Sequence, residues 1–279
     1  MKHPHFKDID MKVAAPSSHE VGVAIKEFAD EWELFHESEY AKVIADVRDK
    51  FLASKTDDMP DGDLTIITRS EIPFILLDNP TPPPYEEMYD EAKRLEPFFV
   101  NHRSYATNVE VGGINKWQSL CLYGFSHAHT GIPEDYGFVE SDELEEQYMD
   151  WTDLSKFCPA TVKWLKEDWA YPYFTRARFM ILRPGGIIAP HIDMDHHELI
   201  PVNVCLNMPD DCYWLYEKFG RLPYKPGTIS FKNISYQHAV WNRSDVDRIH
   251  LIIYGGRGDA KFRNLVVNGL EKAYEKYCK

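Results

Sequence analysis

The sequence predicts a mainly β protein with helical decoration, an α+β class, and two observations support this prediction. From Arg176 to Tyr254, short runs rich in Ile, Val, Phe and Tyr alternate with breakers such as Pro-Gly, Asn-Met-Pro-Asp-Asp and Lys-Pro-Gly. Short strands separated by turn residues are typical of an antiparallel sandwich or barrel. Segments with helical periodicity lie before and after this region, and a chain of 279 residues can bury one sizeable core. We therefore expect a single domain over 1–279.

The N-terminal part predicts helices and two short strands. Residues 19–54 are charged and periodic, which predicts a helix laid on something larger. The runs 64–67 and 72–77 are β-like, and the proline-rich stretch 79–84 predicts a stiff connector that is neither helix nor central strand. Apolar residues at helical spacing then predict a helix over 85–95, ended by Pro97.

The remaining elements frame the strand-rich region. Residues 117–125 predict a buried strand, and 140–150 an acidic helix. Pro159 occupies the position of a first helical turn, and 264–279 predicts a closing helix. We expect a catalytic barrel core over about 100–256, an N-terminal decoration over about 1–99 and the C-terminal helix outside it.

The amino-acid composition disfavours some classes of binding partner. Asp plus Glu total 45 against 31 Lys plus Arg, a net charge of −14, which disfavours nonspecific binding to nucleic acid or to an anionic membrane. The five cysteines form no CxxC pair, as expected for reduced thiols. With no apolar stretch long enough to span a membrane and no signal-type run at the start, the sequence indicates a soluble, cytoplasmic protein.

The segment that ends in Pro190-His191-Ile-Asp193 places a histidine and a carboxylate two residues apart at the end of an expected strand. Because strand side chains alternate between faces, both point the same way and can chelate one ion. A second histidine, His238, follows in Ser235-Tyr-Gln-His238-Ala-Val-Trp. Two imidazoles and one carboxylate leave positions open on the metal, as in non-haem Fe(II) oxygenases, and no cysteine lies beside either motif.

Arg248 follows in Asp247-Arg248-Ile-His250-Leu-Ile-Ile-Tyr254, which predicts a core strand. A cation in such a strand needs an anionic partner, and a guanidinium suits a carboxylate through two parallel hydrogen bonds. A dicarboxylate cosubstrate would supply one. The alternative is an ion pair with a resident acid, Asp247 or Asp245.

The ordered set His191-x-Asp193, His238 and Arg248 resembles the Fe(II)- and 2-oxoglutarate-dependent oxygenases, specifically the aspartyl/asparaginyl β-hydroxylase-like branch. The resemblance covers about 176–256. It includes Leu182-Arg-Pro-Gly-Gly before the first histidine, Gly227-Thr-Ile-Ser-Phe231 before the second, and His238-Ala-Val-Trp-Asn242 after it.

The resemblance implies a double-stranded β-helix (jelly-roll or cupin-like) core with iron near its mouth. It also implies the cofactors, Fe(II) with 2-oxoglutarate and O2, and a reaction in which release of succinate and CO2 accompanies hydroxylation of an unactivated C–H. Arg248 would hold the distal carboxylate of 2-oxoglutarate, and Asn203 matches a position of polar contact to the cosubstrate. Trp214 would line the pocket or belong to the core. Because Asp193 is present, hydroxylation is favoured over halogenation.

Other candidates stand beside this set. Asp195, His196 and His197 follow the first metal motif and are expected in a polar loop, and His127 with His129 forms a second HxH, expected in a loop or a lid. His250 is expected in the core. Three arginines flank the first major strand, and two of them share a face that would suit a substrate carboxylate: Arg176, Arg178 and Arg183.

The leading hypothesis is an oxygenase that hydroxylates an amino acid, free or within a peptide. One rival is a cupin-like metal-binding or sensory protein without oxygenase activity, and another is an oxygenase acting on a different small metabolite. The expected partner is a small-molecule or peptide substrate, with neither nucleic acid nor membrane, and the sequence leaves the oligomeric state open.

Overall fold

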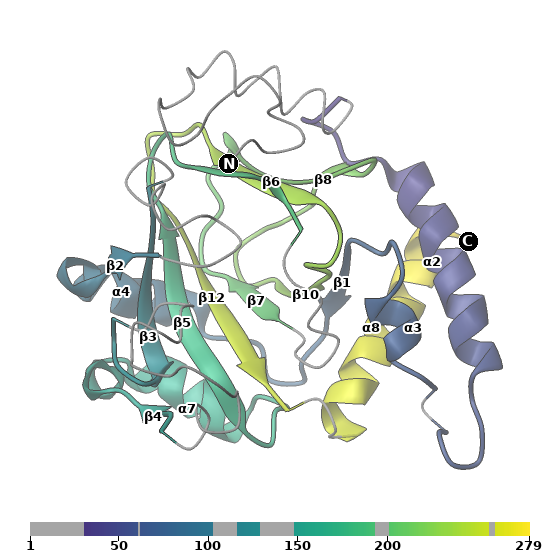
Figure 1. The fold of residues 1–279 in the computed structure, drawn as a ribbon, viewed down its shortest axis with the longest axis horizontal. Helices are drawn as coiled ribbons and strands as arrows, with labels where there is room; N and C mark the ends of the chain where they lie inside the picture. The colour runs from purple at the N-terminus through teal and green to yellow at the C-terminus, as the bar shows by residue number, and fades with distance from the viewer. Residues whose placement is uncertain (1–30, 61, 103–115, 129–147, 193–200, 257–259) are drawn as a thin grey trace.

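The computed structural model describes residues 31–60, 62–102, 116–128, 148–192, 201–256 and 260–279 (Figure 1). Its helices are α2 (Glu37–Ala53), α3 (Thr65–Thr68), α4 (Tyr85–Arg94), α7 (Pro159–Glu167) and α8 (Ala260–Tyr277), with 3-10 turns η1 (Glu96–Phe98) and η4 (Asp153–Phe157). The strands are β1 (Phe74–Leu77), β2 (Val100–Asn101), β3 (Trp117–Gly124), β4 (Asp150–Trp151), β5 (Phe174–Leu182), β6 (Ile187–His191), β7 (Val202–Cys205), β8 (Cys212–Tyr216), β9 (Gly220–Arg221), β10 (Ile229–Lys232), β11 (His238–Asn242) and β12 (Arg248–Gly255).

The strands form two antiparallel sheets. The major sheet has the order β1-β10-β7-β12-β5-β3-β2, with β4 paired to β3, and the minor sheet has the order β6-β11-β8-β9. From β5 onward, successive long strands alternate between the two sheets, with the short β9 extending β8. That alternation is a jelly roll, here a double-stranded β-helix, and it confirms the predicted fold class.

The major sheet is buried on both faces, and the two faces differ in chemistry. Its outward face packs on helices: α8 contacts β1, and α4 contacts β12. Figure 1 shows α2 beside α8 at the edge where β1 lies, and the two helices are in contact. The apolar core of the sheet lies under this cover and includes Phe179, Ile181, Val204, Leu251 and Ile253, each at most 2% exposed.

The inward face of the major sheet meets the minor sheet and is polar. The strand register places Arg248, His250 and Tyr254 of β12 on the same face as Arg176 and Arg178 of β5. Neither these strands nor any other from β5 to β12 contains an aspartate or a glutamate. We call the space between the two sheets the chamber.

One end of the chamber is closed by the turn between β11 and β12. The amide of Asn242 donates hydrogen bonds to the carbonyl oxygens of Leu182 (2.9 Å) and Val246 (2.8 Å), which ties the ends of β5 and β11 to that turn. Arg248 begins β12 at this closed end. His238 begins β11 and Tyr254 lies near the end of β12, so both lie away from it.

Most elements agree with the sequence predictions. Helices α4 and α7 and strands β1 and β3 are confirmed, and α8 begins earlier than predicted. The prediction of a strand at 64–67 is wrong: α3 forms there because the Asp63 carboxylate accepts a hydrogen bond from the Thr65 amide (2.9 Å) at the start of the helix. Of the helix predicted over 19–54, α2 accounts for the second half; residues 19–30 and most of the predicted helix 140–150 lie outside the described residues.

The domain boundaries remain a prediction, although β1, from the N-terminal part, pairs with β10 in the major sheet. No helix in the described part of the chain combines the length and the apolar character needed to cross a membrane.

Candidate active site

Two of the three predicted metal ligands are direct partners across the minor sheet. His191 ends β6, His238 begins β11, and the antiparallel register sets the two residues opposite each other. Their ring centroids are 4.3 Å apart, and the residues are 9% and 3% exposed. Two imidazoles held this close by adjacent strands can bind one ion from the same side.

A backbone contact fixes the orientation of the second ring. The Nδ1 atom of His238 lies 2.9 Å from the carbonyl oxygen of Tyr236. Since a carbonyl can only accept, Nδ1 carries the proton and the lone pair is on Nε2, the tautomer in which imidazole binds a metal. Asp193, the predicted third ligand, lies outside the described residues, and within those residues no three metal-binding side chains cluster.

Arg248 lies deeper in the chamber, at the closed end. Its side chain is completely buried, and none of its three guanidinium nitrogens has a hydrogen-bond partner. The alternative of an ion pair with Asp247 is wrong, because Asp247 accepts hydrogen bonds from Arg183 (2.9 Å) and Lys93 (3.2 Å) instead. A buried cation without an anion is costly, so the guanidinium is arranged for an anion that no residue in the described part of the chain provides.

Arg183 is thereby removed from the candidate substrate arginines. Its guanidinium also bonds Glu96 (2.5 Å), and its Nε donates to Gln118 (2.8 Å). The pKa of the Glu96 carboxyl is lowered by the bonds from Lys93 and Arg183. This cluster fastens η1 to the closed end of the barrel.

Trp214 lines the chamber and connects the histidines to the cations. Its ring lies nearly parallel to His238, with centroids 5.8 Å apart, and edge-on to His250 at 6.4 Å. The guanidinium carbon of Arg248 lies 5.0 Å from the centre of the indole, and the ammonium of Lys232 lies 3.1 Å from it. The sequence prediction left Trp214 open between pocket and core; the structure places it in the buried core between the two sheets, in contact with His238 and with both cations.

Sequence reasoning missed Lys232, a completely buried lysine at the end of β10. The available signal was its spacing: Lys232 follows Ser230 by two residues, so both point to the same face. His250 is buried as predicted, but its Nδ1 has no partner, and burial together with Arg248 and Lys232 holds its pKa well below the ordinary value. This imidazole is therefore neutral at neutral pH.

Asn203 shares the inward face. It lies on β7, opposite Ile252 of β12 and Ser230 of β10, and is 1% exposed with no partner for its Oδ1. This position agrees with the predicted contact to a cosubstrate, which stays a prediction.

Arg176 and Arg178 lie on the inward face of β5, away from the closed end. Arg178 is 5% exposed, and its Nε and Nη1 have no hydrogen-bond partner. Burial, and then the charge of Arg176, lowers the pKa of Arg178 to about 10, so it remains a cation at neutral pH. The chamber thus carries a second positive group, at the end where the histidines lie.

The other residues that the sequence singled out lie away from the paired histidines or outside the described residues. His127 follows β3, and its ring lies edge-on to Phe98 with centroids 6.4 Å apart. His129, the other half of that HxH, lies outside the described residues, as do Asp195, His196 and His197.

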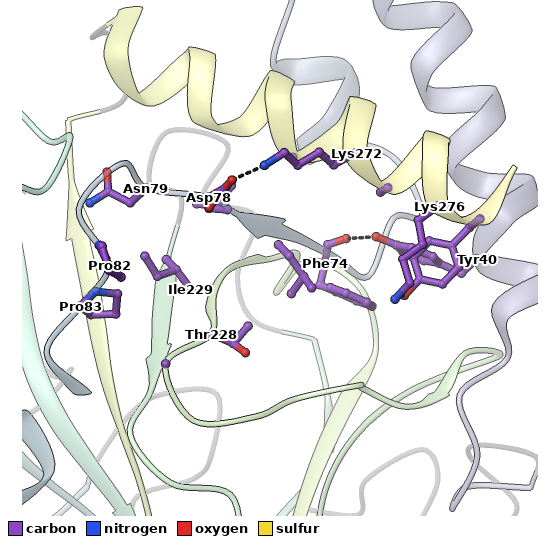
Figure 2. A pocket seen from close by; sticks show the side chains of 16 residues that line it. Tyr40, Phe74, Asp78, Asn79, Pro82, Pro83, Thr228, Ile229, Lys272 and Lys276 are labelled. Carbon is purple, nitrogen blue, oxygen red and sulfur yellow. Dashed lines mark hydrogen bonds and ion pairs between the residues drawn. The ribbon is translucent and has the colours of Figure 1, made fainter. Parts of the chain in front are cut away.

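A separate surface pocket lies between α8, β1 and the proline-rich connector (Figure 2). Asp78, the acid in its lining, is ion-paired with Lys272, and the Tyr40 hydroxyl donates to the Phe74 carbonyl oxygen (2.8 Å). The pocket is on the outward side of the major sheet, and no histidine or cysteine lines it. It has no metal-binding character.

A double-stranded β-helix that sets two histidines side by side on its minor sheet offers two of the three ligands of a two-histidine, one-carboxylate metal site. The sequence profile of the Aspartyl/Asparaginyl beta-hydroxylase family matches residues 83–256, more than half of the chain. The chain belongs to that family and is therefore an enzyme of the hydroxylase type.

Comparison with solved structures finds weaker likenesses. A prolyl-4-hydroxylase from Pseudomonas putida is 13% identical, covers 78% of this chain and 100% of its own, and has a TM-score of 0.37. A 2OG-Fe(II) oxygenase-family oxidoreductase from Burkholderia pseudomallei is 13% identical over 79% of this chain and 93% of its own, with a TM-score of 0.34. The epimerase SnoN from nogalamycin biosynthesis is 10% identical over 77% and 83%, with a TM-score of 0.38. Because these scores are low, the family assignment depends on the sequence profile. Comparison with curated protein sequences gives no match.

Proposed function

We propose that the protein is an Fe(II)- and 2-oxoglutarate-dependent dioxygenase that hydroxylates an amino acid, free or within a peptide. His191, Asp193 and His238 hold the iron, and Arg248 holds the cosubstrate. One observation carries the proposal: a pair of facing histidines and a buried arginine without an anion lie in the same chamber.

The donor set suits ferrous iron. The two imidazoles face each other at 4.3 Å, and the His238–Tyr236 hydrogen bond presents Nε2 of His238. Asp193 follows His191 by two residues and supplies the carboxylate of a two-histidine, one-carboxylate set. Thiolates, which would favour zinc, are absent from the neighbouring sequence.

The cosubstrate fits the charge of the chamber. 2-Oxoglutarate is a dicarboxylate, and the strands from β5 to β12 contribute cations without a single acid, in a protein whose net charge is −14. Arg248 offers the planar fork that binds a carboxylate through two hydrogen bonds. The amide of Asn203 is within the same face and can contact the other end of the molecule.

The residues of the chain position the reactants. Bound iron with 2-oxoglutarate and O2 supplies the oxidising chemistry that converts a C–H bond to an alcohol, with release of succinate and CO2. Arg248 sets the depth to which the cosubstrate enters. Trp214 covers the ring of His238 and excludes water from that side, which strengthens every charge interaction in the chamber.

The positive group at the other end of the chamber favours an anionic substrate. Arg176 and Arg178 share a face of β5, and Arg178 has unpaired nitrogens. The carboxylate of an amino acid, or of an acidic side chain, matches this group. We therefore favour an amino acid or peptide over another small metabolite as substrate, and an oxygenase over a metal-binding or sensory protein that uses the same barrel.

The test is substrate-stimulated turnover. Purified protein with Fe(II), ascorbate and 2-oxoglutarate is screened against free amino acids and short peptides, with succinate and the mass of one added oxygen as readouts. Succinate and a hydroxylated product are expected from the wild type and neither from His191→Ala. Absence of both 2-oxoglutarate binding and succinate formation in the wild type would exclude the proposal.

A further inference from the structure

Lys232 is buried in the chamber, and no described residue supplies an anion for its charge. Its ammonium lies 3.1 Å from the centre of the Trp214 ring and 4.1 Å from the centre of the Tyr224 ring. The side chain has no exposed surface, and its Nζ makes no hydrogen bond or ion pair with any residue that the structure describes. Fully buried lysines are rare unless they are paired, so this one requires an explanation.

Arg248, like Lys232, has no anionic partner among the described residues. Both cations lie against the indole of Trp214, and both are completely buried. The other titratable groups around Lys232 are the thiols of Cys205 and Cys212, and burial raises the pKa of each to about 11, so both are neutral at neutral pH.

Tyr224 shares a 2.6 Å hydrogen bond with Ser230, and burial raises its pKa above the ordinary value; His250, also near both cations, is neutral. Neither carries a negative charge. Among the described residues around Trp214, nothing balances the two positive charges.

We propose that Lys232 and Arg248 together form a two-cation seat for the distal carboxylate of the cosubstrate, with the Trp214 ring holding both cations in place. This inference rests on the proposed function. Arg248 supplies the guanidinium fork, while Lys232 supplies a further charged donor to the lone pairs that the fork leaves open. Lys232 thereby makes the chamber selective for a 2-oxo acid with a second carboxylate.

The experiment compares Lys232→Met with the same change at an exposed neighbour, Lys225→Met. Methionine keeps an unbranched, flexible side chain one atom shorter than lysine and removes the charge. Binding of 2-oxoglutarate and of 2-oxopentanoate, which has the same chain length without the distal carboxylate, is measured by calorimetry with Mn(II) as the metal, and the melting temperature is measured without ligand.

Lys232→Met should weaken 2-oxoglutarate binding about tenfold or more, the loss expected for one charged hydrogen bond. Binding of 2-oxopentanoate and of Mn(II) should not change, and the melting temperature of the free protein should stay or rise, because a buried unpaired charge is gone. Lys225→Met should match the wild type throughout.

Two results would overturn the inference. Unchanged 2-oxoglutarate binding in Lys232→Met would leave Lys232 without a role in the seat. Equal loss of both oxo acids with a lower melting temperature would make Lys232 a structural residue. If Arg248→Met weakens 2-oxoglutarate binding and Lys232→Met does not, only this inference fails; if the wild type does not bind 2-oxoglutarate, the proposed function fails with it.

Discussion

Replacement of Arg248 by methionine should separate ligand binding from stability. The guanidinium is completely buried and unpaired, so the free protein loses no ion pair when it is removed. The complex loses two charge-assisted hydrogen bonds to the carboxylate, each about 1.5 kcal/mol or more. A loss of about 3 kcal/mol corresponds to a rise of about a hundredfold in the Kd for 2-oxoglutarate.

Arg183 provides a matched control, because it is an arginine at the same end of the barrel whose charge is balanced. Its guanidinium pairs with Glu96 (2.5 Å) and Asp247 (2.9 Å). Arg183→Met should lower the free energy of unfolding by about 1 kcal/mol, a value reduced by partial exposure, and should leave the Kd for 2-oxoglutarate unchanged.

The assay is calorimetric binding of 2-oxoglutarate in the presence of Mn(II), together with urea unfolding of the free proteins. The two variants should show opposite signatures, with affinity lost in one and stability lost in the other. If Arg248→Met binds 2-oxoglutarate as tightly as the wild type, another residue holds the distal carboxylate. If Arg183→Met loses as much affinity as Arg248→Met, the balance of charge is not what distinguishes the two arginines.

Five further predictions concern the site and its surroundings. His191→Ala should lose Fe(II) binding measured by equilibrium dialysis, and Asp193→Gly should stop hydroxylation, whereas full activity in the latter would assign the carboxylate elsewhere. Arg178→Met should raise the KM for an anionic substrate at least tenfold with the KM for 2-oxoglutarate unchanged, in steady-state assays. Burial, and then Arg248, lowers the pKa of Lys232 well below its ordinary value, and a bound anion raises that pKa again; 2-oxoglutarate binding should therefore weaken as pH rises through the range in which Lys232 of the free protein loses its proton, measured by calorimetry at a series of pH values. Glu91→Ala should cost about 3 kcal/mol in urea unfolding, since this carboxylate accepts three hydrogen bonds at the start of α7, with no change in metal affinity.

The sequence predicted the fold class because the strand rhythm after Arg176 is local information. Turn residues and short apolar runs report on their own segment, and β5 to β12 form where that rhythm lies. The error at 64–67 has the opposite origin. The β propensity of four residues did not outweigh the hydrogen bond that the Thr65 amide donates to Asp63 and the packing of Ile67 in the core.

The sequence motifs predicted both histidine ligands, but they did not predict that the two histidines lie opposite each other on adjacent strands. His191 and His238 become neighbours only through the register between β6 and β11, which depends on contacts between segments far apart in the sequence. For the same reason, the sequence left the partner of Arg248 open between a cosubstrate and a resident acid, Asp247 or Asp245. The competing partners of Asp247 include Lys93 from α4, a segment with no motif that connects it to this strand.

Lys232 shows why a buried ligand chamber is hard to recognise from alternation alone. In a sheet with one wet face, alternating polarity identifies the inward side. Here both faces of the major sheet are buried, one under helices and one under the minor sheet, so alternation divides the side chains into two sets without indicating which set encloses a ligand. What distinguishes the sets is charge that no described residue balances. Arg178, Lys232 and Arg248 lie on the inward face, no strand from β5 to β12 contains an acid, and an anion bound there would lower the cost of burying these cations. This imbalance of charge lowers the stability of the free protein and favours the binding of an anion. The residues expected to contribute most to cosubstrate binding are therefore those whose removal should not unfold the protein.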